Sequence, residues 1–186
     1  MNSFRAFRFS RRLGSFLPLG LLFAAALLAG CADAPPPAPI GTVTPSGVEL
    51  GEAAPDFALP GPNGDTVRLS EYRGKVVYLD FWASWCGPCL AVLPDLKEIW
   101  TDYRDRDFVI IGVSLDFREN DWREFIAAND MDWPHIFEPL VDDPKTPKGL
   151  YGVTGIPSTF LIDTNGIVVG ENLHGELLRL AIEEYL

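Results

Sequence analysis

Cysteine and histidine are scarce in this sequence, which has three cysteines and two histidines among 186 residues. Cys86 and Cys89 are separated by two residues. A four-ligand zinc site built on this pair would also need both histidines, His135 and His174. A haem attachment motif is excluded because Leu90, not histidine, follows the second cysteine. We therefore expect neither a metal ion nor a bound cofactor.

Basic residues are also few. Lys and Arg number 15 against 26 Asp and Glu, which gives a formal net charge of -11. Residues 1–30 contain four arginines and no acidic residue, so the rest of the chain has 11 basic and 26 acidic residues, a net charge of -15. Such a surface repels nucleic acid, and it either favours a basic partner at low salt or serves solubility alone. We predict no nucleic-acid partner.

The apolar run near the N-terminus is too short to span a membrane comfortably. Leu17–Leu28 follows four arginines and has the features of a targeting segment. It leads into Ala29-Gly30-Cys31, which resembles the bacterial lipobox, where the signal is cut before a cysteine that is then lipidated. The resemblance implies a lipoprotein signal peptide over residues 1–30 and a lipid on Cys31. An ordinary secretory signal or a short anchor is the alternative.

Residues 31–49 are rich in proline and small residues. Such a segment stays extended and builds no core, so we predict a linker that would hold a domain roughly 40 Å from a membrane, at about 3.1 Å per residue. The folded domain is predicted over residues 50–186. With Cys31 lipidated, only Cys86 and Cys89 remain in it, and an oxidising compartment keeps such a pair as a disulfide unless something reduces it.

The hydrophobic pattern of residues 50–186 predicts alternating strands and helices. Residues 75–82 and 108–115 are apolar on both faces, as central strands covered on both sides are. Helical spacing follows each of them, first to about Arg104 and then, with Asn120 as the predicted N-cap, through Ala128.

Turn signals predict two hairpins, one around Gly61-Pro62-Asn63-Gly64 and one around Asn165-Gly166. The order of elements predicts an α/β fold in which a mixed central sheet has helices on both faces. The remaining predicted elements are a strand over residues 133–137, a helical turn over 148–151, strands over 158–162 and 167–170, and a final helix over 176–185.

The stretch Trp85-Cys86-Gly87-Pro88-Cys89 lies between a predicted strand and a predicted helix. This order places Cys86 at a helix N-terminus, where unpaired N–H groups and the helix dipole stabilise a thiolate. The two cysteines can close a tight disulfide and open it again. The pattern therefore predicts a redox site.

From about Leu50 to Leu186 the chain resembles the thioredoxin superfamily, and within it the redoxin-type, membrane-tethered thiol–disulfide oxidoreductases called TlpA/ResA-like. The likeness is carried by Gly51–Phe57, Asp80–Cys89, Pro94 and Tyr151–Pro157. It implies a thioredoxin-like fold with an N-terminal β-hairpin and a central redoxin-type insertion. It also implies a thiol–disulfide oxidoreductase whose partners are protein disulfides and dithiols. We expect the protein to be a monomer.

The resemblance implies catalytic roles for three residues. Cys86 is expected to be exposed and to be the attacking thiolate, and Cys89 is expected to be the buried resolving thiol. Asp80 lies in an apolar stretch before them, where burial would raise its carboxyl pKa and let it accept the proton from Cys89. The alternative is a partly solvated Asp80 at a strand end.

Further residues are expected to bind the substrate. Pro157 resembles the cis-proline that faces the disulfide in this superfamily, and the Ile156 backbone would pair with a substrate chain. Gly87 and Pro88 match reducing members, so we expect a reduction potential toward the thioredoxin value of about -270 mV. Trp85 is expected at the active-site surface.

Departures from the family limit what the resemblance implies. Val92 stands where many relatives carry glutamate, and Leu90 where a basic residue is common, so proton transfer is left to Asp80 and no role in cytochrome c maturation is inferred. A thiol peroxidase is one alternative, but its Thr and Pro would fall at Ala83 and Leu79. A non-catalytic copper or thiol-relay module is another, although copper-delivering relatives space their cysteines one residue further apart.

The expected location follows from the lipobox. A domain that follows a lipidated Cys31 faces the periplasm or the cell exterior, at either the inner or the outer membrane of a diderm cell. Because that compartment is oxidising, a reductase there needs an electron source. The resemblance therefore implies a membrane electron-donor protein as a partner.

Overall fold

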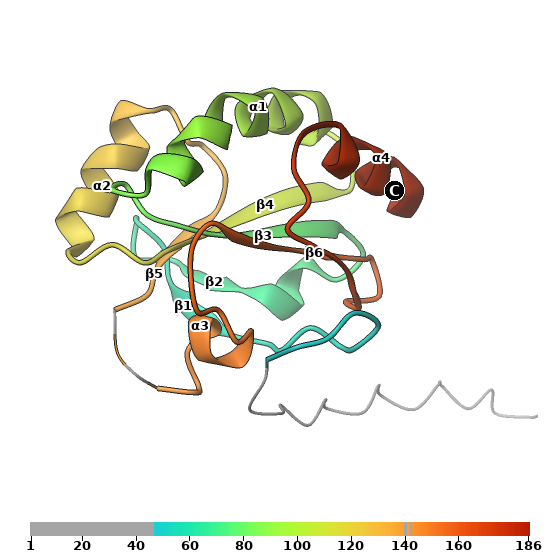
Figure 1. Cartoon of the computed structure of the whole chain (residues 1–186), viewed down its shortest axis with the longest axis horizontal. Helices are drawn as coiled ribbons and strands as arrows, with labels where there is room; N and C mark the ends of the chain where they lie inside the picture. Colours follow the sequence, from blue (N-terminus) through green and yellow to red (C-terminus); the bar gives the residue numbers. More distant parts are fainter. Residues whose placement is uncertain (1–46, 140, 142) are drawn as a thin grey trace, which may run out of the picture. The chain divides into compact units, whose positions relative to one another are not determined.

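A five-stranded mixed sheet is the centre of the computed structural model, which describes residues 47–139, 141 and 143–186 (Figure 1). The strand order is β5-β4-β3-β6-β7, in which β3, β4 and β5 are parallel while β6 and β7 are antiparallel to their neighbours. Every residue of β3 is buried, since it pairs on both sides and both of its faces are covered. The strands are β3 (Val76–Trp82), β4 (Phe108–Ser114), β5 (His135–Phe137), β6 (Ser158–Ile162) and β7 (Val168–Glu171).

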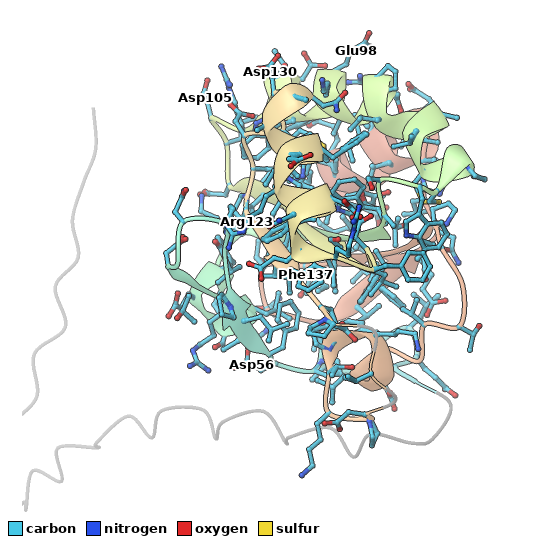
Figure 2. All side chains as sticks on the ribbon, turned by 90° about the vertical axis from the view of Figure 1, so that its left-hand side faces the viewer. Asp56, Glu98, Asp105, Arg123, Asp130 and Phe137 are labelled. Carbon is cyan, nitrogen blue, oxygen red and sulfur yellow. A yellow bond between two sulfur atoms is a disulfide. The ribbon has the colours of Figure 1, made fainter. Side chains whose placement is uncertain are left out.

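Three helices cover one face of this sheet: α1 (Gly87–Tyr103), α2 (Glu119–Ala128) and α4 (Gly175–Tyr185). Alternate residues of β3 and β4 point toward them, because successive side chains of a strand lie on opposite faces. Charged side chains such as Glu98, Asp105 and Asp130 lie on the outside of this helical layer (Figure 2). The apolar side chains buried beneath the helices include Tyr78, Trp82, Leu96, Ile99, Ile110, Trp122, Leu178 and Ile182.

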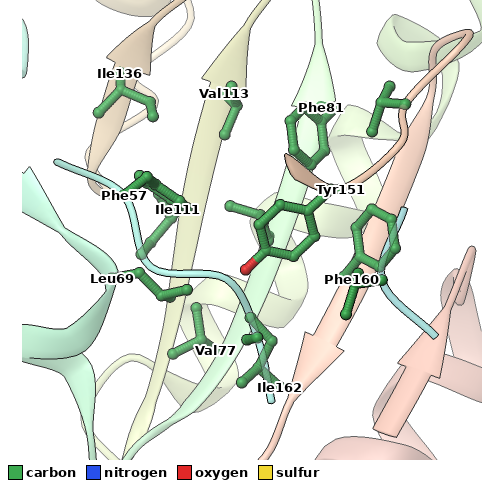
Figure 3. Packing of buried hydrophobic residues seen from close by; sticks show 14 of the residues in the cluster. Phe57, Leu69, Val77, Phe81, Ile111, Val113, Ile136, Tyr151, Phe160 and Ile162 are labelled. Atoms are coloured by element: carbon green, nitrogen blue, oxygen red, sulfur yellow. The ribbon is translucent and has the colours of Figure 1, made fainter. Parts of the chain in front are cut away.

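The opposite face is covered by the hairpin of β1 (Ala58–Pro60) and β2 (Thr66–Arg68), the 3-10 helix η1 (Leu69–Tyr72) and the short helix α3 (Pro147–Leu150). Tyr151, which follows α3, packs at the centre of this layer (Figure 3). Its ring lies 5.8 Å from Phe81 and 5.0 Å from Phe160, and its hydroxyl donates to the Pro55 carbonyl at 3.0 Å. A buried tyrosine hydroxyl needs such a partner.

The segment between β4 and α3 contains α2 and β5. It adds a parallel strand at the β4 edge of the sheet, with Gly112 of β4 opposite His135 of β5. The mixed central sheet and the N-terminal hairpin confirm the expected α/β fold.

The predicted N-cap of α2 is wrong. The helix begins at Glu119, and Arg118 occupies the N-cap position in an extended conformation without a side-chain cap, so Asn120 lies inside the first turn. Electrostatics explains the earlier start. Glu119 and Asp121 place negative charge near the positive end of the helix dipole, and the Arg118 guanidinium pairs with Asp121 at 2.6 Å.

The predicted signal peptide, Cys31 and most of the linker lie outside the described residues. In residues 47–139, 141 and 143–186, no helix is both long and apolar enough to span a membrane.

Replacement of Gly112 by alanine is expected to destabilise the sheet. A Cβ atom there would overlap the His135 ring and lie 3.1 Å from Trp82 Nε1, deep in the core. Overpacking of this kind lowers the free energy of unfolding by about 1–3 kcal/mol. The measurement is urea denaturation, with Gly155→Ala as control, because a Cβ at Gly155 meets no atom within 4 Å. Equal stability of the two variants would contradict the packing described.

Candidate active site

Cys86 and Cys89 form a disulfide at the start of α1, with an S–S distance of 2.00 Å. Cys86 is the N-cap of the helix, and its Sγ accepts a hydrogen bond from the Cys89 N–H at 3.3 Å. Gly87 and Pro88 form the first turn, where the missing N–H of a proline removes no helical hydrogen bond. The predicted placement of Cys86 at the helix N-terminus is confirmed.

The expected exposure of Cys86 is wrong for this disulfide state. Cys86 is 4% exposed and Cys89 is 6% exposed, so the two residues are almost equally buried. The Cys86 side chain turns back toward the first turn of α1, and both cysteines join the apolar cluster that contains Trp82 and Ala83. Of the motif, Trp85, Gly87 and Pro88 are the exposed members.

Asp80 lies on β3 and points to the sheet face that α1 covers, as Tyr78 and Trp82 do. It is 9% exposed, and burial raises the pKa of its carboxyl to about 7. Among the described residues, no group donates a hydrogen bond to this carboxyl, so nothing there offsets the cost of the charge. The residue is therefore buried, as predicted, and titrates near neutral pH.

A second buried carboxylate, Asp116, holds the loop that precedes Cys86. Asp116 follows β4 and is fully buried. It accepts hydrogen bonds from the Ser84 N–H at 3.0 Å, the Ser84 hydroxyl at 2.6 Å and the Ser114 hydroxyl at 2.7 Å. These donors compensate its desolvation. Sequence reasoning missed this residue, although a Ser-x-Asp directly after a buried parallel strand indicated it, because parallel strands end at the same edge.

Trp85 and Phe117 stack on each other beside this loop. Their ring centroids are 5.3 Å apart with planes inclined by 25°. Trp85 is 52% exposed and Phe117 is 71% exposed. The expectation that Trp85 lies at the surface is confirmed, whereas Phe117 was not singled out from the sequence.

The Ile156–Pro157 peptide bond is cis, as expected. Ser158, the next residue, pairs with Phe81, which places Pro157 at the end of β3, where the loop to Cys86 begins. Ile156 packs against the cluster that contains both cysteines. In the part of the chain that the structure describes, neither backbone group of Ile156 takes part in a hydrogen bond. An open hollow lies beside these residues and is lined by Thr154, Gly155, Ile156 and Pro157.

The two histidines lie on other elements than the disulfide, His135 on β5 and His174 at the start of α4. His135 is buried against Trp133 and Trp82, with ring centroids 5.4 and 6.0 Å away, and burial lowers its pKa to about 3. His174 is the N-cap of α4. Across the described ranges, no group of three or more His, Cys, Asp or Glu side chains is arranged to hold a metal ion.

Comparison with known proteins gives relatives for most of the chain. The AhpC/TSA family matches residues 50–170. The thiol-disulfide oxidoreductase ResA of Bacillus thuringiensis subsp. konkukian is 32% identical over 139 residues, which cover 75% of this chain and 78% of that protein. ResA of Oceanobacillus iheyensis is 36% identical over 141 residues, 74% of this chain and 71% of that protein.

Similar solved structures are also thiol–disulfide oxidoreductases. The thioredoxin domain of a thiol-disulfide oxidoreductase from Bacteroides vulgatus has a TM-score of 0.68 at 31% identity and covers 74% of this chain and 98% of its own. A thiol:disulfide interchange protein from Bacteroides sp. has a TM-score of 0.66 at 31% identity, with 74% and 90% covered. The family match spans both cysteines, Asp80 and Pro157.

Replacement of Asp80 by asparagine is expected to stabilise the oxidised protein at high pH. The unfolded carboxyl ionises near pH 4 and the folded one near pH 7, so wild-type stability falls as the pH rises through this interval. Asparagine carries no charge, so the variant should be more stable at pH 8 by about 2–4 kcal/mol and close to wild type at pH 4. Denaturant unfolding at pH 4, 6 and 8 measures this difference. Asp105→Asn, on the surface, is the control, and a pH dependence shared by Asp80→Asn and wild type would refute the assignment.

Proposed function

We propose that this chain, which belongs to the AhpC/TSA family and is a thiol–disulfide oxidoreductase related to ResA, reduces disulfides of exported proteins through Cys86 and Cys89. The observation that carries the proposal is the Cys86–Cys89 disulfide at the start of α1, on the same sheet face as a carboxyl that titrates near neutral pH. The three groups supply a nucleophile, a resolving thiol and a base.

The reaction starts from the dithiol form. The Cys86 thiolate attacks one sulfur of the substrate disulfide, and a new S–S bond joins Cys86 to that sulfur. The substrate S–S bond breaks, and its other sulfur leaves as a thiolate with the electron pair. The Cys89 N–H, which now donates to Cys86 Sγ, is positioned to stabilise the attacking thiolate together with the helix dipole.

The second step releases the substrate. The Cys89 thiol gives its proton to Asp80, and the resulting thiolate attacks Cys86 Sγ. The bond between Cys86 and the substrate breaks, so the substrate leaves with a second thiolate and the enzyme is left as the disulfide. Two electrons have moved from the enzyme to the substrate. Another dithiol protein must restore the reduced form, and we propose a membrane electron donor for this task.

The position next to the cis-proline supports binding of an extended substrate chain. Ile156 offers free backbone groups just before the start of β6, and β-augmentation would pair them with the substrate. Trp85, Gly87 and Pro88 are exposed around the disulfide and form the rest of the proposed contact.

Peroxide reduction and copper binding receive no such support. Leu79 and Ala83, where a peroxidase would carry Pro and Thr, are fully buried apolar residues. His135 is buried among tryptophan rings and His174 begins another helix, so neither accompanies the cysteines.

The cellular setting is proposed from the sequence. The lipobox ending in Cys31 and the linker of residues 31–49 support a lipid-anchored domain outside the cytoplasmic membrane. There the substrates would be exported proteins with surplus or incorrect disulfides.

The Cys86→Ser variant is expected to lose insulin disulfide reduction, because serine cannot attack the substrate sulfur. Cys89→Ser should instead accumulate a mixed disulfide with the substrate, since the resolving thiol is gone. Turbidity of insulin and mass spectrometry of the trapped adduct measure the two results. Retained insulin reduction by Cys86→Ser would refute the assignment of Cys86 as the attacking thiol.

The wild-type domain, equilibrated in dithiothreitol buffers, should have a reduction potential near the thioredoxin value of about -270 mV.

Asp80→Asn is expected to slow the second step about 100-fold, as loss of a general base does. In wild type the rate of mixed-disulfide resolution should rise with pH through about 7, because the ionised carboxyl is the base. The variant should lack this inflection. Stopped-flow resolution of a preformed Cys86 adduct gives the rates, with Asp105→Asn as control. An unchanged profile in Asp80→Asn would remove Asp80 from the mechanism.

A further inference from the structure

We propose that Trp85 and Phe117 form an aromatic platform that selects substrates with a large apolar side chain next to the reacting cysteine. The proposal rests on the proposed function, because a substrate must bring a sulfur atom to Cys86. Trp85, the neighbour of Cys86 in the chain, is then within reach of residues that flank this sulfur.

The platform differs from the other aromatic residues of the domain. Elsewhere in the described residues, every Phe, Trp and Tyr side chain is buried or half-buried, whereas Trp85 and Phe117 are more than half exposed and in contact with each other. Single exposed apolar residues need no explanation, but a stacked pair beside a reactive sulfur offers a flat surface of the kind that anchors partner side chains.

Asp116 fixes the platform before any substrate arrives. Ser84, which precedes Trp85, donates two hydrogen bonds to the buried carboxylate, and Phe117 directly follows Asp116. The same carboxylate therefore anchors the backbone on both sides of the stack. A surface that is already ordered binds more tightly, since little conformational entropy is lost on binding.

The chain on either side of Cys86 carries no charge. No Asp, Glu, Lys or Arg occurs between Asp80 and Asp95 or between Lys148 and Asp163, two of the three segments that meet at the active site. In the third segment Asp116 is buried, and Arg118, next to Phe117, is paired with Asp121 at 2.6 Å, while the exposed Glu171 lines the hollow beside Pro157. A charged group placed on the two aromatic rings would thus lose water without an unpaired charge from these segments to meet it, whereas an apolar group gains burial.

The occupant is therefore a protein disulfide whose cysteine has an aromatic or large aliphatic neighbour, rather than one flanked by charges. Two disulfide-linked peptides of equal length test this, one with Phe and one with Ser beside the cysteine. Wild type should reduce the Phe peptide with a kcat/KM about tenfold higher, the effect expected of one buried aromatic contact.

Phe117→Ala should remove this preference through a higher KM for the Phe peptide, with the Ser peptide unchanged within about twofold, and Phe117→Tyr should retain the preference. Trp85→Ala should also lose the preference for the Phe peptide, with a lower kcat/KM for both peptides, because Trp85 belongs to the general substrate contact as well. The control is Leu180→Ala, because Leu180 is an exposed apolar residue on α4, next to Arg179, which pairs with Asp102 near the C-terminal end of α1, far along the helix from Cys86.

Equal kcat/KM for the two peptides in wild type would overturn the proposal, and so would an equal loss for both peptides in Phe117→Ala. Hydroxyethyl disulfide, which is small and neutral, serves as a third substrate and distinguishes failure of the platform proposal from failure of the proposed function. Wild type that reduces hydroxyethyl disulfide but does not distinguish the peptides has the proposed chemistry without the platform. Wild type that reduces none of the three lacks the proposed function itself.

Discussion

The register of β3 between β4 and β6 is the constraint on which the active site depends. Trp82 pairs with Ser114 on one side, and Phe81 pairs with Ser158 on the other. Both pairs lie where β3 ends, so three segments that are far apart in the sequence meet there: the disulfide loop, the end of β4 and the cis-proline. Because one step of register turns every side chain to the opposite face, the burial of β3 on both faces also fixes which residues meet. Strand pairing, more than any local motif, thus determines which residues meet at the active site.

Two buried carboxylates at this end of the sheet serve different purposes because their surroundings differ. Asp116 is surrounded by serine donors and makes hydrogen bonds that hold a loop. Asp80 lies among apolar side chains without a donor among the described residues, and burial raises its pKa. The carboxylate of Asp116 therefore makes a loop rigid, whereas the carboxyl of Asp80 can act as a titratable base. The difference follows from the hydrogen bonds that Asp116 accepts and Asp80 lacks. A base that titrates near neutral pH is what a thiol needs in order to lose its proton.

Much of this site was predictable from the sequence, because its central features are local. The Cys-x-x-Cys pair falls between an apolar strand and a helical pattern, and this order alone places Cys86 at a helix start. Asp80 stands in a run of apolar residues, so its burial and raised pKa could be inferred. The strand-end position of Asp116 was a usable signal, but its contact with Ser84 and the contact of Phe117 with Trp85 were not predictable locally, because each pair is 32 residues apart and only the β3–β4 pairing brings them together. The burial of Cys86 does not follow from the local pattern, because it depends on how the closed disulfide packs. The start of α2 does not follow from it either, because charged residues compete for the positions at the helix end.

The uncharged aromatic platform has a consequence for how copies of this domain behave toward one another. Exposed stacked rings form an apolar surface, and burial of two such surfaces against each other would favour association. The domain and linker, however, carry a net charge of -15 outside residues 1–30, and copies of like charge repel each other. The acidic surface would thus oppose the approach of a second copy to the platform. Excess negative charge on the surface of such a domain leaves the exposed rings open to chains of other composition.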